Sequence, residues 1–126
     1  CKRLVPFFMD MIQKNVVPKI FGDGTNTRDY IYVMDLTNFM ADCIDKSSPT
    51  KLFHLANGKE ISVNEVYEVL KNVTGFEKDA EKIAEIKGEV KKIVLDISLA
   101  QKELSWNPTT ELDEGIKKTW EWLNSK

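Results

Sequence analysis

Apolar residues recur at three- and four-residue spacing in four stretches of the chain, a spacing that places them on one face of an α-helix. The four helices expected from it cover residues 5–15, 35–46, 62–74 and 110–124. A fifth, short helix is expected to open at Asp96, or at Ser98 with Gln101, and to end at Leu104. The third opens with Ser62 and Glu65, a capping box in which each side chain satisfies a free amide at the helix start. Pro6 suits the first helical position, where its missing N–H costs nothing, and Asp35 and Thr110 can cap two other helices through their side-chain oxygens.

The apolar faces of these helices predict a shared core. The face expected to be buried on the second helix consists of Leu36, Phe39, Met40, Cys43 and Ile44. The tryptophans, which are Trp106, Trp120 and Trp122, are expected to pack in the interior. Packing explains these residues better than cofactor contact does, because stripes at helical spacing are typical of core-facing surfaces.

Short runs rich in β-branched, aromatic and aliphatic residues predict the strands. They cover residues 19–21, 30–33, 52–56 and 90–95, with a further strand around 82–86. Turn residues follow two of them, Gly22-Asp23-Gly24 after the first and Asn57-Gly58 after the third. The order α-β-β-α-β-α-(β)-β-α-α indicates an α/β fold, a small mixed lobe of α+β character that occupies residues 1–126.

Composition favours one domain and excludes several classes of protein. A chain of 126 residues, 42% of them apolar, can supply one modest core. The net charge of −2, with both signs interspersed, offers no basic surface for nucleic acid. No window approaches the roughly 18 apolar residues that span a bilayer, and no signal peptide is visible. We therefore expect no membrane partner and a cytoplasmic location.

Cysteine and histidine are too few and too scattered for a metal site. Cys1 and Cys43 lie outside any C-x-x-C pattern and are expected to be incidental or buried thiols. The one histidine, His54, has no acid or nucleophile nearby in sequence, which favours a structural or partly exposed role. The chain begins at Cys1 without an initiator methionine and runs at once into the first helix, so we expect it to be a piece of a longer protein.

Candidate chemistry concentrates between residues 19 and 35. The glycines of the Gly22-Asp23-Gly24 turn permit backbone angles that other residues resist. Arg28 follows the turn at the mouth of the expected strand 30–33. A guanidinium at such a position suits a phosphate, which it can grip with two parallel charge-assisted hydrogen bonds. The alternative is a surface arginine paired with Asp29 or Asp35.

The same stretch resembles a known family. An apolar pair, Gly-Asp-Gly, a short spacer, Arg-Asp-Tyr-Ile-Tyr-Val and an aspartate run from residue 20 to residue 35. This pattern is similar to that of the extended short-chain dehydrogenase/reductases acting on nucleotide sugars, the group of UDP-glucose 4-epimerases and dTDP-glucose dehydratases. Later landmarks, including Leu-Ala-Asn-Gly, a Gly-Glu pair and a terminal Leu-x-Glu-Gly-Ile helix, extend the resemblance over about residues 4–123.

The resemblance implies a nucleotide-sugar site in the C-terminal, substrate-binding part of such an enzyme. It assigns Arg28 to the diphosphate, and the strand of Lys19, Ile20 and Phe21 to the border of the uracil pocket, where a backbone edge can read an imide ring. An ordinary edge strand with Phe21 in the core is an alternative compatible with that role. The expected ligand is a UDP-sugar, and the expected partner is a Rossmann lobe that lies outside this sequence.

The cofactor and the acid/base pair of the family are expected outside this sequence. The resemblance implies hydride transfer to NAD, which needs a Gly-rich loop between a strand and a helix, and a Tyr-x-x-x-Lys pair. No Gly-rich loop of that kind is present. Tyr67 and Lys71 have the Tyr-x-x-x-Lys spacing, but Tyr67 falls on the apolar face of its helix. We expect no catalytic, cofactor-binding or metal-binding residue here, and neither NAD binding nor turnover by this chain alone.

One departure from the family affects the diphosphate site. Ile86 stands where family members usually carry a second phosphate-binding arginine, two residues before the Gly-Glu pair. Lys87 can substitute for it, as a point charge rather than a fork. Ile93 stands where some epimerases place an aromatic beside the sugar. These changes bear on the sugar preference and on the activity of the whole protein.

Three functions remain open. The first is the substrate-binding lobe of an NAD-dependent UDP-glucose/UDP-galactose 4-epimerase, and the second is the same lobe of a nucleotide-sugar 4,6-dehydratase. The third is a non-catalytic binding or interaction module that kept the lobe without the chemistry. A Gly-rich loop and a catalytic Tyr-x-x-x-Lys upstream in the gene would favour an enzyme. Without its Rossmann partner the lobe would expose apolar surface, so we expect homo-oligomers of the isolated chain.

Overall fold

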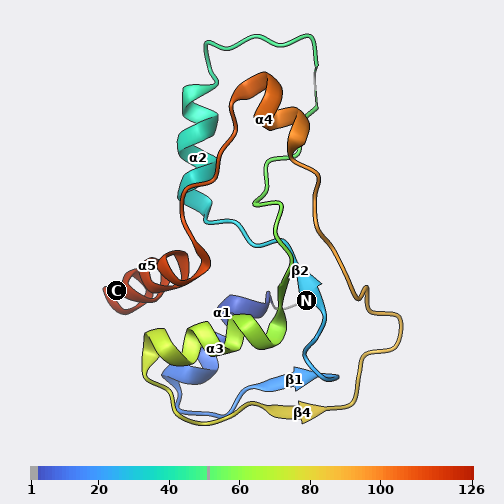
Figure 1. Ribbon diagram of the computed structural model, residues 1–126. Helices are drawn as coiled ribbons and strands as arrows, with labels where there is room; N and C mark the ends of the chain where they lie inside the picture. Colours follow the sequence, from blue (N-terminus) through green and yellow to red (C-terminus); the bar gives the residue numbers. More distant parts are fainter. Residues whose placement is uncertain (1–2, 51) are drawn as a thin grey trace.

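The computed structural model describes residues 3–50 and 52–126 and contains the five expected helices (Figure 1). Nine elements follow one another along the chain, and they are α1 (Leu4–Gln13), β1 (Lys19–Phe21), β2 (Thr27–Arg28), α2 (Val33–Asp42), β3 (Ile61–Ser62), α3 (Val63–Thr74), β4 (Glu81–Ile83), α4 (Ser98–Leu104) and α5 (Leu112–Asn124). The result is a small mixed α/β fold. Its helices are longer than its strands, as the sequence predicts.

Two small sheets connect the elements near the candidate site. β1 and β4 run parallel, and Ile20 lies opposite Lys82. β2 and β3 run antiparallel, and Thr27 lies opposite Ser62. Thr27 also forms an isolated parallel bridge with Lys92. The segment that follows β4 therefore runs from β1 to β2 and borders both strands.

The hydrophobic core lies between α1, α3 and α5, which gather in the lower part of Figure 1. Its buried members are Phe8, Met9, Ile12, Ile20, Val66, Tyr67, Leu70 and Ile116. The capping box of Ser62 and Glu65 is confirmed, and Gly75 ends α3 in the left-handed conformation at φ 72°. We call α1, α3, α5, β1 and β4 the core lobe.

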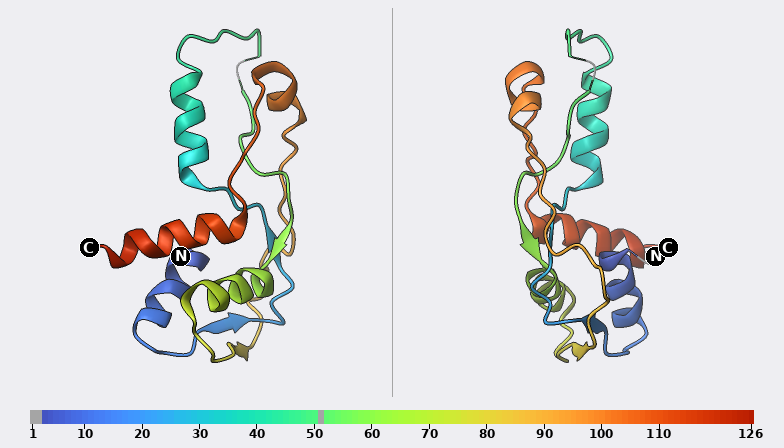
Figure 2. Two further views of the ribbon diagram at one scale, coloured as in Figure 1. Left: turned by 60° about the vertical axis from the view of Figure 1, so that its left-hand side comes forward. Right: turned by 90° about the vertical axis from the view of Figure 1, so that its right-hand side faces the viewer.

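A second region extends away from this core (Figure 2). It consists of α2, the loop 43–57, α4 and the segment 105–110, and we call it the arm. The rings of Phe39 and Trp106 meet edge to face at 4.7 Å, and the Trp106 indole donates to the carbonyl of Ala56 at 2.8 Å. The Ser48 hydroxyl donates to Glu103 on α4 at 2.6 Å. The arm is thus held together mainly by a few ring and polar contacts.

The predicted burial of the α2 face is wrong. None of the five residues is fully buried, and Met40 and Ile44 are exposed, Ile44 to 81%. The predicted strand 52–56 is not part of any sheet among the described residues. The burial prediction fails because amphipathic spacing shows which face is apolar, not which neighbour covers it. The strand prediction fails because composition does not supply the partner strand that a sheet requires.

The predicted start of α2 is also wrong. Residues 30–32 form no strand, and the helix begins at Val33 with Tyr32 as its N-cap. Asp35 lies inside the first turn, where its carboxylate accepts the backbone and hydroxyl hydrogen bonds of Thr110 at 2.8 and 2.7 Å. Thr110 therefore ties the arm together rather than capping α5, whose N-cap is Glu111.

The observed structure differs from the predicted elements at a few other residues. Pro6 lies third in α1 rather than first, since the helix begins at Leu4. Residues 90–95 form only the single bridge at Lys92.

Trp106 is buried as expected, whereas Trp122 is 57% exposed. Cys43 is a partly buried free thiol, and the expectation for Cys1 lies outside the described residues. No helix in the described part is long and apolar enough to cross a membrane.

Candidate functional site

The glycine turn between β1 and β2 is sharp because both glycines adopt positive φ, 71° at Gly22 and 79° at Gly24. A side chain at Gly24 would collide with Asn64, whose backbone amide donates to the Gly24 carbonyl at 3.0 Å. The hydroxyl and backbone amide of Thr25 both donate to the Asp23 carboxylate, and these bonds lower the pKa of Asp23. The turn is thus fixed locally and against the start of α3.

The strand before this turn offers one open edge. Pro18 accepts from the amide of Glu81, and Gly22 donates to the carbonyl of Ile83, both at 2.9 Å. In a parallel ladder alternate residues face the partner strand. The backbone groups of Lys19 and Phe21 therefore point away from β4, toward an edge with no partner strand among the described residues.

The three side chains of β1 lie in different surroundings. Ile20 has its side chain in the core, and its backbone groups face β4 rather than the open edge. Phe21 is 46% exposed, which makes the alternative of a core phenylalanine wrong. Lys19 is exposed, and its ammonium lies 3.7 Å from the carboxylate of Glu81. The strand has the exposed aromatic and free backbone edge that recognition of a flat ring requires.

Arg28 is held on two sides. Its Nη1 donates to the carbonyl of Thr27 at 2.7 Å, and its Nη2 lies 3.5 Å from Oε1 of Glu89. The alternative pairing with Asp29 or Asp35 is not observed. Asp29 accepts from the backbone amides of Asn57 and Gly58, both at 2.9 Å, while Asp35 binds Thr110.

Glu89 and Asn26 are neighbours of Arg28 that the sequence did not identify. The Asn26 amide donates to Oε2 of Glu89 at 3.1 Å. With 7% of its surface exposed, Asn26 is the one buried residue of polar or charged type in the described part of the chain. The one sequence signal was the Gly88-Glu89 pair, which places the carboxylate three residues before the bridge between Lys92 and Thr27.

The loop 84–91 carries the remaining predicted residues. Ile86, in the place of the family's second arginine, is 47% exposed, and Lys87 is also exposed. No ion pair or side-chain hydrogen bond of Lys87 is found within residues 3–50 and 52–126. No contact joins the Lys87 ammonium to Arg28, whereas Glu89 from the same loop forms an ion pair with Arg28. Ile93 is 41% exposed beyond the loop.

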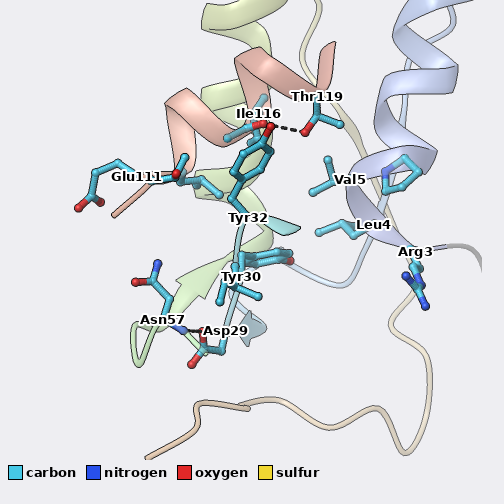
Figure 3. Close-up of a pocket in the computed structure, with 15 residues that line it drawn as sticks. Arg3, Leu4, Val5, Asp29, Tyr30, Tyr32, Asn57, Glu111, Ile116 and Thr119 are labelled. Atoms are coloured by element: carbon cyan, nitrogen blue, oxygen red, sulfur yellow. Dashed lines mark hydrogen bonds between the residues drawn. The ribbon is translucent and has the colours of Figure 1, made fainter. Parts of the chain in front are cut away.

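A pocket of about 400 Å³ lies beside this site, and none of the five predicted residues lines it (Figure 3). Its walls come from the start of α1, the segment 29–32, Asn57 and the first turns of α5. Tyr30 and Tyr32 lie along one wall, facing Leu4 and Val5. Burial raises the pKa of the Tyr30 phenol, and the charge of Arg28 lowers it by a smaller amount.

Tyr67 and Lys71 are each engaged in structural contacts. The Tyr67 ring packs edge to face on Phe8 at 5.4 Å, and its hydroxyl donates to the carbonyl of Lys78 at 2.8 Å. Burial raises the pKa of Tyr67, the opposite of what an acid/base tyrosine near neutral pH needs. Lys71 pairs with Asp79 at 2.8 Å. These contacts favour packing and surface charge over proton transfer.

The described residues do not fit NAD. A dinucleotide site places its glycines between a strand and a helix N-terminus, where the pyrophosphate meets free amides. The Gly22–Gly24 turn instead joins β1 to β2. Within residues 3–50 and 52–126 no group of three or more His, Cys, Asp or Glu could hold a metal ion.

Comparisons with known proteins agree with one another. The family model described as GDP-mannose 4,6 dehydratase matches residues 1–119. A putative UDP-glucose 4-epimerase of Methanocaldococcus jannaschii is 37% identical over 97% of this chain and 39% of its own length. The crystal structure of UDP-glucose 4-epimerase with UDP-glucose from Thermotoga maritima covers 98% of this chain and 40% of its own, with 32% identity and a TM-score of 0.89.

A third comparison concerns the fold alone. UDP-glucuronic acid 4-epimerase from Bacillus cereus, in complex with UDP-glucuronic acid and NAD, is 21% identical and has a TM-score of 0.87. It covers 98% of this chain and 40% of its own length. The chain thus spans about two-fifths of the length of each of these three proteins.

Proposed function

Because this chain belongs to the GDP-mannose 4,6-dehydratase family, among the extended short-chain dehydrogenase/reductases of nucleotide-sugar epimerases and dehydratases, we propose that it is the substrate-binding lobe of a UDP-sugar 4-epimerase. In the proposed complex Arg28 binds the diphosphate. The backbone of Lys19, Ile20 and Phe21 borders the base, and Lys87 approaches the phosphates as a secondary cation. UDP-glucose and UDP-galactose are the proposed substrates of the whole protein.

The observation that carries this proposal is a guanidinium, that of Arg28, held by two contacts and joined through the glycine turn to a strand with one open edge. The guanidinium is fixed by Thr27 and Glu89 and keeps further N–H donors for an anion. The short, well-defined Gly22–Gly24 turn connects this cation to the free backbone groups of Lys19 and Phe21. A nucleoside diphosphate presents a planar, hydrogen-bonding ring and two charged phosphates, which are the two features such a surface recognises.

The proposal assigns the redox step to another part of the protein. NAD would be bound by a Rossmann lobe outside these 126 residues, together with the acid/base tyrosine and lysine, and this chain alone would be inactive. That division is supported by the Gly22–Gly24 turn, which joins two strands and does not fit a dinucleotide. A cytoplasmic location is proposed as well, in keeping with two cysteines that form no disulfide pattern in the sequence.

Calorimetric titration of UDP, and then UDP-glucose, into the chain at low salt tests the binding role. We expect measurable affinity in the wild type and a loss of about tenfold or more in Arg28→Ala, because charge-assisted hydrogen bonds contribute about 1.5–3 kcal/mol each. Arg3→Ala, which removes the other arginine of the sequence, serves as the matched charge control. Binding that is equal in wild type and Arg28→Ala would contradict the proposal.

A dehydratase lobe is the second candidate, and the description of the matching family favours it. The two functions share the diphosphate contact and differ in the nucleotide and in the catalytic half. Titration of GDP and dTDP beside UDP separates them by base. Preference for GDP or dTDP would favour a dehydratase, and no binding of any of the three would show that this chain alone is not a nucleotide-binding module.

A further inference from the structure

We infer that Asn26 and Glu89 are positioning residues for Arg28: the buried amide fixes the carboxylate, and the carboxylate fixes the guanidinium. The consequence of this positioning for ligand affinity rests on the proposed function. Neither residue belongs to the surface assigned to base or diphosphate above.

Arg28 needs a second contact to hold one orientation. An arginine side chain has several rotatable bonds and about 2 kcal/mol of rotamer entropy. The bond from Nη1 to Thr27 joins it to the adjacent residue, on a strand of only two residues. Such a local contact leaves the direction of the outer guanidinium face free. The ion pair of Nη2 with Glu89, 61 positions further along the chain, removes that freedom.

Glu89 in turn depends on Asn26. The carboxylate lies in the exposed loop 84–91, next to Gly88 at φ 83°, and the loop itself offers little support. Its two oxygens have different partners, since Oε1 faces Arg28 and Oε2 accepts from Asn26 at 3.1 Å. Asn26 is a fixed donor to Oε2, and Arg28 is a mobile cation at Oε1. With one oxygen bound by each, the plane of the Glu89 carboxylate is set.

Asn26 is the rigid end of this chain of contacts. It is 7% exposed, and its backbone carbonyl accepts from the amide of Val63 at 3.0 Å, at the first residue of α3. α3 carries three of the core residues, and the capping box fixes its first turn. The order of support is therefore α3, Asn26, Glu89 and Arg28, from the core outward to the candidate phosphate contact.

This arrangement has a consequence for affinity. A guanidinium held in its binding orientation before the ligand arrives pays less side-chain entropy on binding. Ile86 leaves no second fork in the loop, so the diphosphate contact depends on this one cation more heavily. Loss of the Asn26 hydrogen bond should weaken UDP binding even though the variant retains both charges.

The first test uses nuclear magnetic resonance and needs no ligand. The sequence contains only two arginines, so Arg3 serves as an internal reference for the Arg28 side-chain Nε–Hε signal. We expect a distinct Arg28 signal that is protected from exchange in the wild type. It should move toward the signal of a free arginine in Asn26→Ala and in Glu89→Gln. Asn38→Ala, an exposed asparagine on α2, is the matched control and should leave it unchanged.

The second test measures UDP affinity by calorimetry. We expect Asn26→Ala to weaken binding by about three- to tenfold, the worth of one hydrogen bond, with Asn38→Ala equal to wild type. Thermal unfolding of each variant shows whether the fold survives. If Asn26→Ala does not fold, Glu89→Gln, at a partly exposed site, provides the test instead. An Arg28 signal that stays at its wild-type position in both folded variants overturns the inference. Absence of UDP binding in the wild type would instead count against the proposed function, and the resonance test would still decide the positioning.

Discussion

The core lobe and the arm are built from helices with similar apolar patterns, yet they bury very different amounts of surface. In the core lobe Phe8, Val66 and Leu70 are fully enclosed between α1, α3 and α5. In the arm α2 has no buried residue, and Ile44 and Leu52 are exposed to 81% and 77%. The arm depends instead on Trp106, its one large buried side chain, and on polar contacts.

The difference indicates which region supports the candidate site. β1, the glycine turn and Asn26 all lie against the core lobe, through Ile20 and the start of α3. The arm contributes none of the residues that hold Arg28. Stability of the core lobe should therefore govern nucleotide binding, and substitutions in the arm should leave binding unchanged.

The largest expected effect on the free energy of unfolding comes from removing a buried side chain from the core. Phe8→Ala should lower the free energy of unfolding by about 3–5 kcal/mol, because it removes a fully buried ring that packs on Tyr67. Ile44→Ala in the arm should change it by less than about 0.5 kcal/mol. Urea unfolding followed by circular dichroism measures both. Similar losses for the two variants would show that the arm is as well packed as the core lobe.

The next effect is pH-dependent and concerns the arm. Burial raises the pKa of Asp35, but the hydrogen bonds from Thr110 and Thr109 outweigh it, so the pKa is lowered overall. A carboxyl group with a depressed pKa stabilises the fold above its unfolded pKa of about 3.9, and that stabilisation disappears as the pH falls through the lower, folded value.

Asp35→Asn should consequently be less stable than wild type near neutral pH, by less than about 1 kcal/mol because water screens a partly exposed group. The gap should close as the pH falls below about 4. Asp42→Asn, also on α2 and exposed, is the matched control. Urea unfolding at several pH values provides the comparison, and a gap that is constant with pH would contradict the assignment.

The smallest effect on stability is expected from the exposed face of α2, where the change should appear in assembly instead. Met40 and Ile44 present apolar surface, and such surface favours self-association. We expect the isolated chain to form dimers or larger assemblies, and Ile44→Glu to shift it toward monomer with little change in unfolding free energy. Sedimentation equilibrium tests this, since a wild-type mass that stays monomeric at all concentrations would refute it.

The helices were predictable from sequence because their signals are local. Spacing of apolar residues located four of them, a start signal at Asp96 or Ser98 located α4, and the capping box fixed the start of α3. Strands were harder, since a strand is defined by its partner. Residues 30–33 have strand-like composition, yet the chain turns into α2 at Val33, and the strand consists of Thr27 and Arg28 alone.

The candidate site was predictable only in part. The motif identified the β1 edge and Arg28, because the glycines and the guanidinium have local chemical meaning. The neighbours of Arg28 were not predictable. Glu89 lies 61 positions away in the chain, and the sequence around Asn26 is typical of a loop. The pocket beside Tyr30 joins α1, the segment 29–32 and α5, and no local pattern marks such a meeting.

The most direct test of the central claim is a UDP titration followed by two-dimensional 15N–1H resonance spectra of the chain. We predict that the shifted signals belong to the Lys19 and Phe21 amides and to the Arg28 side chain, while the amides of α2 and α4 stay in place. Shifts confined to the arm, or to the pocket around Tyr32 and Ile116, would contradict the claim that the strand edge and Arg28 form the nucleotide site.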